Sequence, residues 1–365
     1  MAQVWHKWGA TMKPAPDTAT DTVSARNFQS DGGFGTISTP RLEFVSPPSR
    51  RLPKFTRAKH SWRPPLVLQE RDLTFLRAAA DCRLLSTPQY LLLFPESRDA
   101  VYRRLQLLFH HGYLDRLGGN PSAPMVYALA TRGAEILVER GYLKDAGDWR
   151  KRNQDLRDRY IAHQAMITNF RITLTLATRE RPGIRLLFFR REGLDLRDRV
   201  IATGNGRRQT LPINPDGFFG LQFPELPEGR NRAFFFLEAD RSTMTRERFV
   251  QKLMGYWEWF SQGGHTRKHG IRSFRVLTVT KSEERTASLN QAAGEAEDLR
   301  EGLRIFWFTS EKRFTPDQPA SVFEPIWETS DRPGTPKSIL PQASITADPA
   351  GVHARSLAPP APRPA

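Results

Sequence analysis

A long helix with one apolar side constrains the fold of this chain more than any other segment of its sequence. Apolar and aromatic residues recur on one stripe from residue 156 to residue 177, and Pro182 then ends the helix. The stripe consists of Leu156, Tyr160, His163, Ile167, Phe170, Leu174 and Ala177. A helix that is apolar on one side must bury that side, so we expect it to lie on a β-sheet.

Apolar segments that follow this helix predict the strands of that sheet. We expect strands at 184–189, 209–223, 232–241, 273–280 and 303–308, and a helix at 244–260. Side chains alternate along a strand, so Glu238 and Asp240 should share one face with Phe234 and Phe236. Residues 153–315 are therefore predicted to form an α/β domain with a mixed sheet.

The preceding segment, residues 66–145, reads as short helices followed by one hairpin. Helices are predicted at 69–80, from Ser86 to Pro95, and at 97–111, and short strands at 113–117 and 125–129. Three helices followed by a hairpin predict a winged-helix domain. The whole chain is thus expected to be α/β in class, or α+β overall, with the winged helix N-terminal to the larger α/β domain.

The third predicted helix carries the candidate DNA-binding residues. Val101, Leu105 and Leu108 form its packing stripe, whereas Arg103, Gln106 and His110 should point outward. In a winged helix this element enters the major groove, so Arg103 and Gln106 are predicted to contact base edges. Phosphate contacts are predicted for Arg98, Arg104 and Arg116. Two alternatives stay open: solvated surface charges, or a winged helix that binds protein.

Composition favours nucleic acid as the partner. The chain has 55 Lys and Arg against 39 Asp and Glu, which gives a net charge of +16 and a pI of about 10.4. An anionic membrane surface is the competing partner, but no segment approaches the roughly 20 apolar residues of a membrane span. Cys82 is the only cysteine and the N-terminus resembles no secretory signal, so we expect a cytoplasmic protein without disulfides.

Both ends of the chain are predicted to be disordered. Residues 1–63 are rich in Pro, Ser, Thr and Gly and end in a basic run, and residues 331–365 end in APPAPRPA. The basic run suggests either an arm that touches DNA phosphates or a solvated linker.

The larger domain resembles the PD-(D/E)XK restriction-endonuclease-like core in its element order and its carboxylates. Asp216 and Glu238 would bind Mg²⁺ or Mn²⁺ in such a core. The lysine expected two residues after the glutamate is replaced by Asp240, and Lys252 on the following helix is the candidate substitute. His163 is a further candidate for this site. The alternatives are an inactive core, a satisfied core histidine, and neutralisation of the carboxylates by Arg241 or Lys252.

Together the two domains resemble the replication-relaxation family of bacterial plasmids and mobile elements, over about residues 66–315. The segments that carry the resemblance are RDAVYRRLQLLFHHGYLDR, MVYALATRGAEIL, YIAHQAMITNFRITL, INPDGFF and FFFLEADRSTMTRERFVQKLMGY. The resemblance implies a DNA-associated role in replication, relaxation or mobilisation. It also implies that His163, Asn169, Asp216, Glu238 and Asp240 belong to one site.

The sequence therefore leads to one principal hypothesis and two alternatives. The principal one is a protein that reads duplex DNA with a winged helix. The alternatives are a Mg²⁺-dependent nuclease or nickase, and a scaffold that contacts a relaxase or a replication initiator.

Overall fold

The computed structural model describes residues 52–117, 123–154, 156, 158–191, 195–204, 207–299 and 301–341. The chain divides into two units, residues 1–52 and 53–365, and the description below concerns the second unit alone. Most of the two predicted tails lies outside the described residues. The prediction of a mixed α/β chain is confirmed.

The N-terminal part of the described chain is mainly helical. Its elements are η1 (His60–Trp62), α1 (Glu70–Cys82), β1 (Leu85–Ser86), α2 (Thr87–Leu93), α3 (Arg98–His110), β2 (Leu114–Leu117), β3 (Val126–Leu129), α4 (Thr131–Glu139) and α5 (Trp149–Gln154). The three strands form a small antiparallel sheet in the order β1-β3-β2. Ser86 caps α2, with Pro88 in its first turn, as the sequence predicts.

These helices surround one apolar core. It includes the fully buried residues Phe75, Leu76, Tyr90, Val101, Leu105, Leu108 and Leu129. The predicted stripe of α3 is therefore the side that packs. Ile172, from the next long helix, belongs to the same core, so that helix joins the helical part to the sheet that follows.

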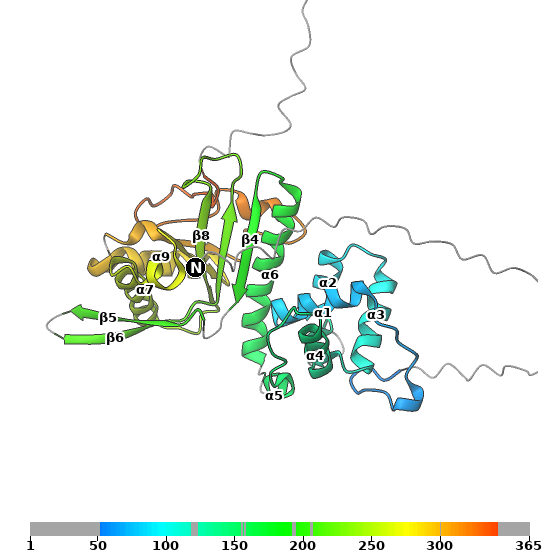
Figure 1. The fold of residues 1–365 in the computed structure, drawn as a ribbon. Helices are drawn as coiled ribbons and strands as arrows, with labels where there is room; N and C mark the ends of the chain where they lie inside the picture. The colour runs from blue at the N-terminus through cyan, green and yellow to red at the C-terminus, as the bar shows by residue number, and fades with distance from the viewer. Residues whose placement is uncertain are drawn as a thin grey trace, which may run out of the picture. The chain divides into compact units, whose positions relative to one another are not determined.

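The C-terminal part contains a five-stranded mixed sheet and a separate two-stranded hairpin. Its elements are α6 (Asp158–Glu180), β4 (Arg185–Arg191), β5 (Asp198–Gly204), β6 (Arg207–Ile213), β7 (Gly217–Gln222), β8 (Arg232–Asp240), α7 (Arg246–Ser261), α8 (Gly264–His269), β9 (Arg275–Thr280), α9 (Glu283–Glu295), η2 (Glu297–Leu299), η3 (Leu303–Ile305), β10 (Phe306–Ser310) and η4 (Pro319–Phe323). The sheet order is β10-β9-β8-β7-β4, with β8, β9 and β10 parallel and the other pairs antiparallel (Figure 1).

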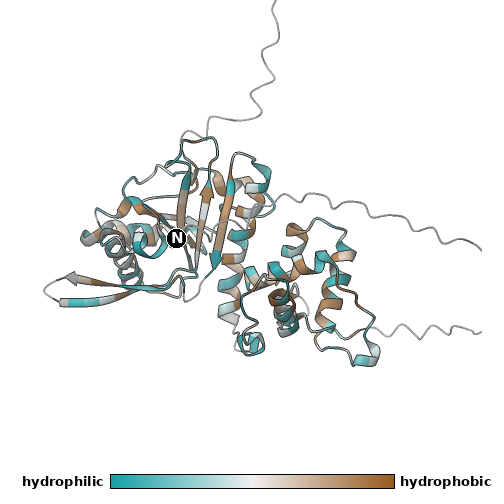
Figure 2. Ribbon diagram, in the orientation of Figure 1, coloured by the Kyte–Doolittle hydropathy of each residue, from teal (hydrophilic) through white to brown (hydrophobic). Residues whose placement is uncertain are grey.

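Helices cover both faces of this sheet. Ile167, Phe170, Leu174 and Ala177 of α6 pack on one face, so the predicted stripe lies on a sheet as expected. Helices α7 and α9 pack on the other face, against residues such as Phe236 of β8. In Figure 2 the central strands carry the apolar colours, in agreement with a sheet that is buried on both sides.

Aromatic rings pack closely around one glycine of the sheet. A Cβ atom at Gly220 of β7 would lie 3.0 Å from the ring of Phe188 and 3.2 Å from that of Phe234. Glycine therefore lets two aromatic rings from the neighbouring strands close over β7.

Four sequence predictions need correction. The predicted strand at 209–223 is two strands, β6 and β7, because Pro215 interrupts the ladder. Helix α6 begins at Asp158, so Leu156 lies outside it. The folded part begins before residue 63, since Ala58 is buried, and continues beyond 331, since Ile339 and Leu340 pack into the core of the sheet. The few apolar residues at these two ends lie within polar segments, so the sequence shows no helical or strand periodicity that would predict folding there.

Candidate nucleic-acid interface and carboxylate cluster

The first half of α3 presents a polar, positively charged side. Arg98, Tyr102 and Arg103 are exposed and Gln106 is half-buried. The Arg98 guanidinium lies 5.4 Å from the centroid of the Tyr102 ring, a cation–π contact that limits its motion. The outward positions predicted for Arg103 and Gln106 are confirmed. Val101, Leu105 and Leu108 pack in the core, so Arg103 and Gln106 lie on the other side of α3.

Arg104 was predicted to contact phosphate, and the structure places it inside the protein. Its Nε donates a hydrogen bond to Oδ1 of the fully buried Asp72 (2.5 Å), and its second terminal nitrogen pairs with Oδ2 of the same carboxylate. A further bond reaches the Val67 carbonyl (2.6 Å). Asp72 also accepts a bond from the Gln69 amide in the cap of α1. Arg104 therefore fixes α3 to the start of α1.

His110 was predicted to point outward, and it too is buried. The amide of Ala58 donates a hydrogen bond to its Nδ1 (3.1 Å). Burial, together with the nearby charge of Arg116, lowers the pKa of His110 to about 4. The ring is therefore neutral at pH 7 and holds the segment that precedes η1 against the end of α3.

A cleft of about 730 Å³, to which β2 contributes Asp115, Arg116 and Leu117, is lined by arginines. We call it the arginine cleft; its charged residues are Arg57, Arg63, Arg116, Arg132, Arg150 and Asp115. Asp115 pairs with Arg57 at 2.5 Å. Within the part of the chain that the structure describes, none of the other four arginines forms an ion pair with a carboxylate. The cleft is therefore strongly positive.

Aromatic rings and backbone carbonyls hold two of these arginines in place. The Arg116 guanidinium lies 4.5 Å from the Phe109 ring centroid and donates to the Lys54 carbonyl (2.6 Å). Arg132 lies 4.8 Å from the Tyr113 ring centroid and donates to the His111 carbonyl (2.8 Å). These contacts orient the guanidinium groups and leave their charge uncompensated, which is the arrangement that an external anion requires.

A second set of charged residues lies in the C-terminal part, between α6, β8 and α7. His163 Nε2 lies 3.3 Å from Asp216 Oδ2, which also accepts a bond from the Ala239 amide (2.8 Å). His163, a candidate for this site from the sequence, therefore contacts Asp216. Glu238, only 3% exposed, pairs with Lys252 and accepts a 2.5 Å bond from the Tyr256 hydroxyl.

Burial and charge act in opposite directions on these groups. Burial raises the pKa of Glu238 to about 7, although Lys252 opposes the rise. Burial also acts to raise the pKa of Asp216, but the hydrogen bond from His163 and the charge of Lys252 outweigh it and lower that pKa. Burial acts to lower the pKa of Lys252, and Glu238 and Asp216 outweigh it. The single positive charge of Lys252 therefore stabilises the ionised forms of both Asp216 and Glu238.

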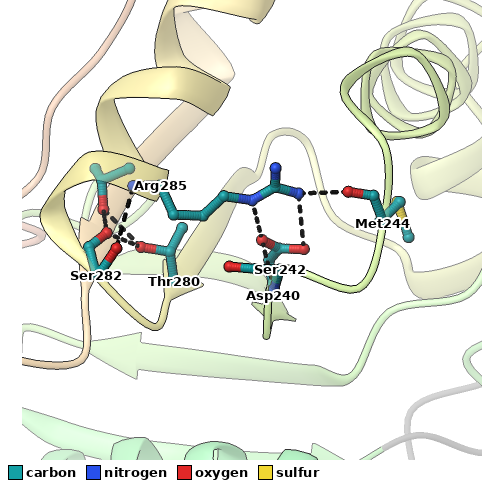
Figure 3. A network of polar contacts seen from close by, with 7 residues as sticks. Asp240, Ser242, Met244, Thr280, Ser282 and Arg285 are labelled. Atoms are coloured by element: carbon teal, nitrogen blue, oxygen red, sulfur yellow. Dashed lines mark hydrogen bonds and ion pairs between the residues drawn. The ribbon is translucent and has the colours of Figure 1, made fainter.

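Asp240 is neutralised by an arginine that the sequence did not indicate. Arg285 Nε donates to Asp240 Oδ2 (2.6 Å), and its Nη2 donates to Oδ1 (3.3 Å) and to the Met244 carbonyl (2.7 Å) (Figure 3). Of the two cations suggested for the carboxylates, Lys252 has that role, whereas Arg241 donates to the Ala162 carbonyl. Because Arg285 lies 45 residues from Asp240, no local spacing connects the two.

The resemblance placed Asn169 with these carboxylates, and its partner lies elsewhere. The Asn169 side chain accepts a 2.6 Å hydrogen bond from Gln89 of α2, so it joins α6 to the helical part. Among the described residues, no group of three or more His, Cys, Asp or Glu side chains is arranged to hold a metal ion. Asp216 and Glu238 are the two carboxylates that would bind one, and a cation there would compete with Lys252.

Comparison with known proteins gives one match. Residues 76–273, more than half of the chain, match the family model described as replication-relaxation. No curated protein and no solved structure matches the chain. None of the helices in the described ranges is long and apolar enough to span a bilayer.

Proposed function

The chain belongs to the replication-relaxation family, and we propose from this that it binds double-stranded DNA during the replication, relaxation or mobilisation of a plasmid or other mobile element. The observation that carries the proposal is the arginine cleft, where four guanidinium groups have no carboxylate partner among the described residues. Guanidinium groups bind phosphate well, because two of their parallel N–H donors match two phosphate oxygens.

The order of elements around the cleft supports a winged-helix interpretation. Helices α1, α2 and α3 precede the hairpin β2–β3, and the exposed residues of α3 lie in its first half. In winged helices and related motifs the N-terminal residues of the third helix contact base edges. We therefore assign Arg103 and Gln106 to base contacts, and Arg98 and Arg116 to the DNA backbone. Residues 118–122, within the connection between the two predicted strands of the hairpin, lie outside the described residues.

Binding of the full-length chain to a labelled duplex of about 30 base pairs tests this proposal by fluorescence anisotropy. Replacing Arg98 and Arg103 together by Ala should weaken binding by at least about tenfold, because two charge-assisted contacts are lost. A matched control is the pair Arg230→Ala and Arg232→Ala, two exposed arginines beside the β7–β8 turn. Absence of binding by the unaltered protein, or equal losses in both double variants, would contradict the proposal.

A second function is supported by one specific contact. Lys252 lies against Glu238, so the cluster contains the lysine that position 240 lacks, together with Asp216 and His163. These are the residue types that a divalent-metal-dependent nuclease needs, with Asp216 and Glu238 as the carboxylates that would bind Mg²⁺.

Nicking of supercoiled plasmid with Mg²⁺ or Mn²⁺ tests this second function. Activity that disappears in both Asp216→Ala and Glu238→Ala, while duplex binding persists, would establish it. The control is Arg230→Ala, an exposed position outside the cluster, which should nick plasmid as the unaltered protein does. No nicking with either metal would leave the chain a DNA-binding protein with a structural carboxylate cluster.

A further inference from the structure

The hairpin of β5 and β6 lies outside the five-stranded sheet and extends away from it (Figure 1). It occupies the connection between β4 and β7. Its two strands pair antiparallel over seven positions, from Asp198 with Ile213 to Gly204 with Arg207. Val200, Ala202, Leu211 and Ile213 are buried and belong to the core that includes α7. One face of the hairpin is therefore fixed to the domain.

The other face is exposed and positively charged. The register places Arg199 opposite Pro212, and Ile201 opposite Thr210, and all four side chains are exposed. Arg208 is exposed two positions before Thr210 on the same strand. Asp198 is the one acidic residue in the sequence between Arg197 and Pro215. Its carboxylate accepts a bond from Trp259 Nε1 (2.9 Å) and so is already engaged with α7.

More cations lie at the base of the hairpin. Arg199, Arg267 and Lys268 line a cleft of about 470 Å³ that is formed by β5, the end of α7 and α8. Lys268 donates to the Arg197 carbonyl (2.6 Å), and Arg267 donates to the Gln262 carbonyl (2.5 Å). Both donors bind neutral carbonyls, so their charges add to the positive surface.

We propose that this hairpin is a second contact for duplex DNA, in addition to the one proposed for α3. A two-stranded ribbon has the dimensions to enter the major groove, and arginines on its outer face would contact phosphate or base edges. Ile201 is 52% exposed, which suits contact with a thymine methyl group. The inference rests on the proposed function, since both contacts use the same ligand.

Charge neutralisation in the full-length chain tests the inference. The variant is Arg199→Gln with Arg208→Gln, and the matched control is Arg230→Gln with Arg232→Gln. On a duplex of about 40 base pairs, the hairpin pair should weaken binding about tenfold and reduce the salt slope by about 2.

Cross-linking gives an independent measurement. Cys82 is buried, so Ile201→Cys introduces an accessible thiol for a photoreactive label. The label should cross-link to the 40-base-pair duplex, and the cross-linking yield should fall at high salt. The control is Glu228→Cys, which is exposed in the β7–β8 turn at the opposite end of β7, and it should give little cross-linking.

The outcomes separate this inference from the proposed function. If the Arg98 and Arg103 variant weakens binding but the hairpin pair matches its control, the hairpin inference is wrong and the α3 proposal stands. If the hairpin pair weakens binding and the α3 variant does not, the hairpin inference stands and the α3 proposal is wrong. Failure of the unaltered protein to bind duplex DNA would overturn both.

Discussion

The arginine cleft and the carboxylate cluster are both rich in charged side chains, and they differ in where those charges find partners. In the cleft, five arginines face one aspartate, and that aspartate is paired with Arg57. In the cluster, Asp216 contacts His163, Glu238 pairs with Lys252 and Asp240 pairs with Arg285. The cluster is compensated within the protein, whereas the cleft has positive charge available for a ligand.

This difference predicts different consequences for mutation in the two regions. A buried charge that loses its partner is costly, because its desolvation is no longer offset. An exposed charge that is removed changes stability little and changes ligand binding more. Variants in the cluster should therefore affect unfolding, and variants in the cleft and at the exposed positions of α3 should affect DNA affinity.

The largest effect is expected at Lys252. Lys252→Ala leaves Glu238 buried without a cation and should lower the free energy of unfolding by about 3 to 5 kcal/mol. Urea denaturation at pH 8 measures this, with the exposed Lys268→Ala as control. The double variant Lys252→Met with Glu238→Gln should recover much of the loss. A loss below about 1 kcal/mol for Lys252→Ala would show that the cluster is not compensated as described.

Two adjacent arginines on α3, one buried and paired and the other exposed, test more sharply whether loss of a buried charge costs more stability than loss of an exposed one. Arg104→Ala should lower the free energy of unfolding by about 2 to 3 kcal/mol, because the Asp72 carboxylate keeps only its bond from the Gln69 amide. The neighbouring Arg103→Ala should change it by less than about 0.5 kcal/mol. Thermal or urea unfolding of both variants measures the contrast, and equal losses would contradict it.

Arg103 and Arg116 are expected to contact DNA in different ways, the first at base edges and the second at phosphates. Replacing Arg103 and Gln106 by Ala should reduce discrimination between DNA sites by about 1 to 3 kcal/mol. Arg116→Ala should instead weaken all sites alike. Competition binding with a series of duplexes separates these results, and identical behaviour of the two variants would remove the distinction between base and phosphate contacts.

The smallest expected effect is a pH dependence from His110. Its pKa of about 4 lies below the value of about 6.5 in an unfolded chain, so its contribution to stability is complete above pH 6.5 and is lost as the pH falls toward 4. The loss should reach about 2 kcal/mol between pH 6.5 and pH 5. His110→Asn should flatten this dependence, and the exposed His60→Asn should not. An unchanged profile in His110→Asn would contradict the assignment.

Periodicity predicted much of the fold because it depends on residues close in sequence. The α6 stripe from Ile167 to Ala177 and the α3 stripe from Val101 to Leu108 were both found, and Glu238 was placed on the same face of its strand as Phe236. Residue type alone did not reveal which arginines were exposed. Arg104 pairs with Asp72 from 32 residues away, and tertiary packing decides that contact.

The candidate site was predicted in part for the same reason. His163, Glu238 and Lys252 were identified because each lies on a recognisable helix or strand, and Asp216 because it precedes the apolar residues of β7. Arg285 and the cleft residues Arg132 and Arg150 were missed, because they become neighbours of the other charges only after the chain folds. The β5–β6 hairpin was missed because β6 and β7 were merged into one predicted strand and no strand was predicted over the residues of β5.

The central claim is that the uncompensated charges of the arginine cleft bind DNA phosphates. The most direct test is the slope of log affinity against log salt concentration for the unaltered protein and for Arg132→Ala with Arg150→Ala. We expect a steep slope that becomes shallower by about 2 in the cleft variant, since each lost phosphate contact removes about 0.9. The Lys252→Met with Glu238→Gln variant should keep the original slope. A slope near zero, or one that the cleft variant leaves unchanged, would contradict the claim.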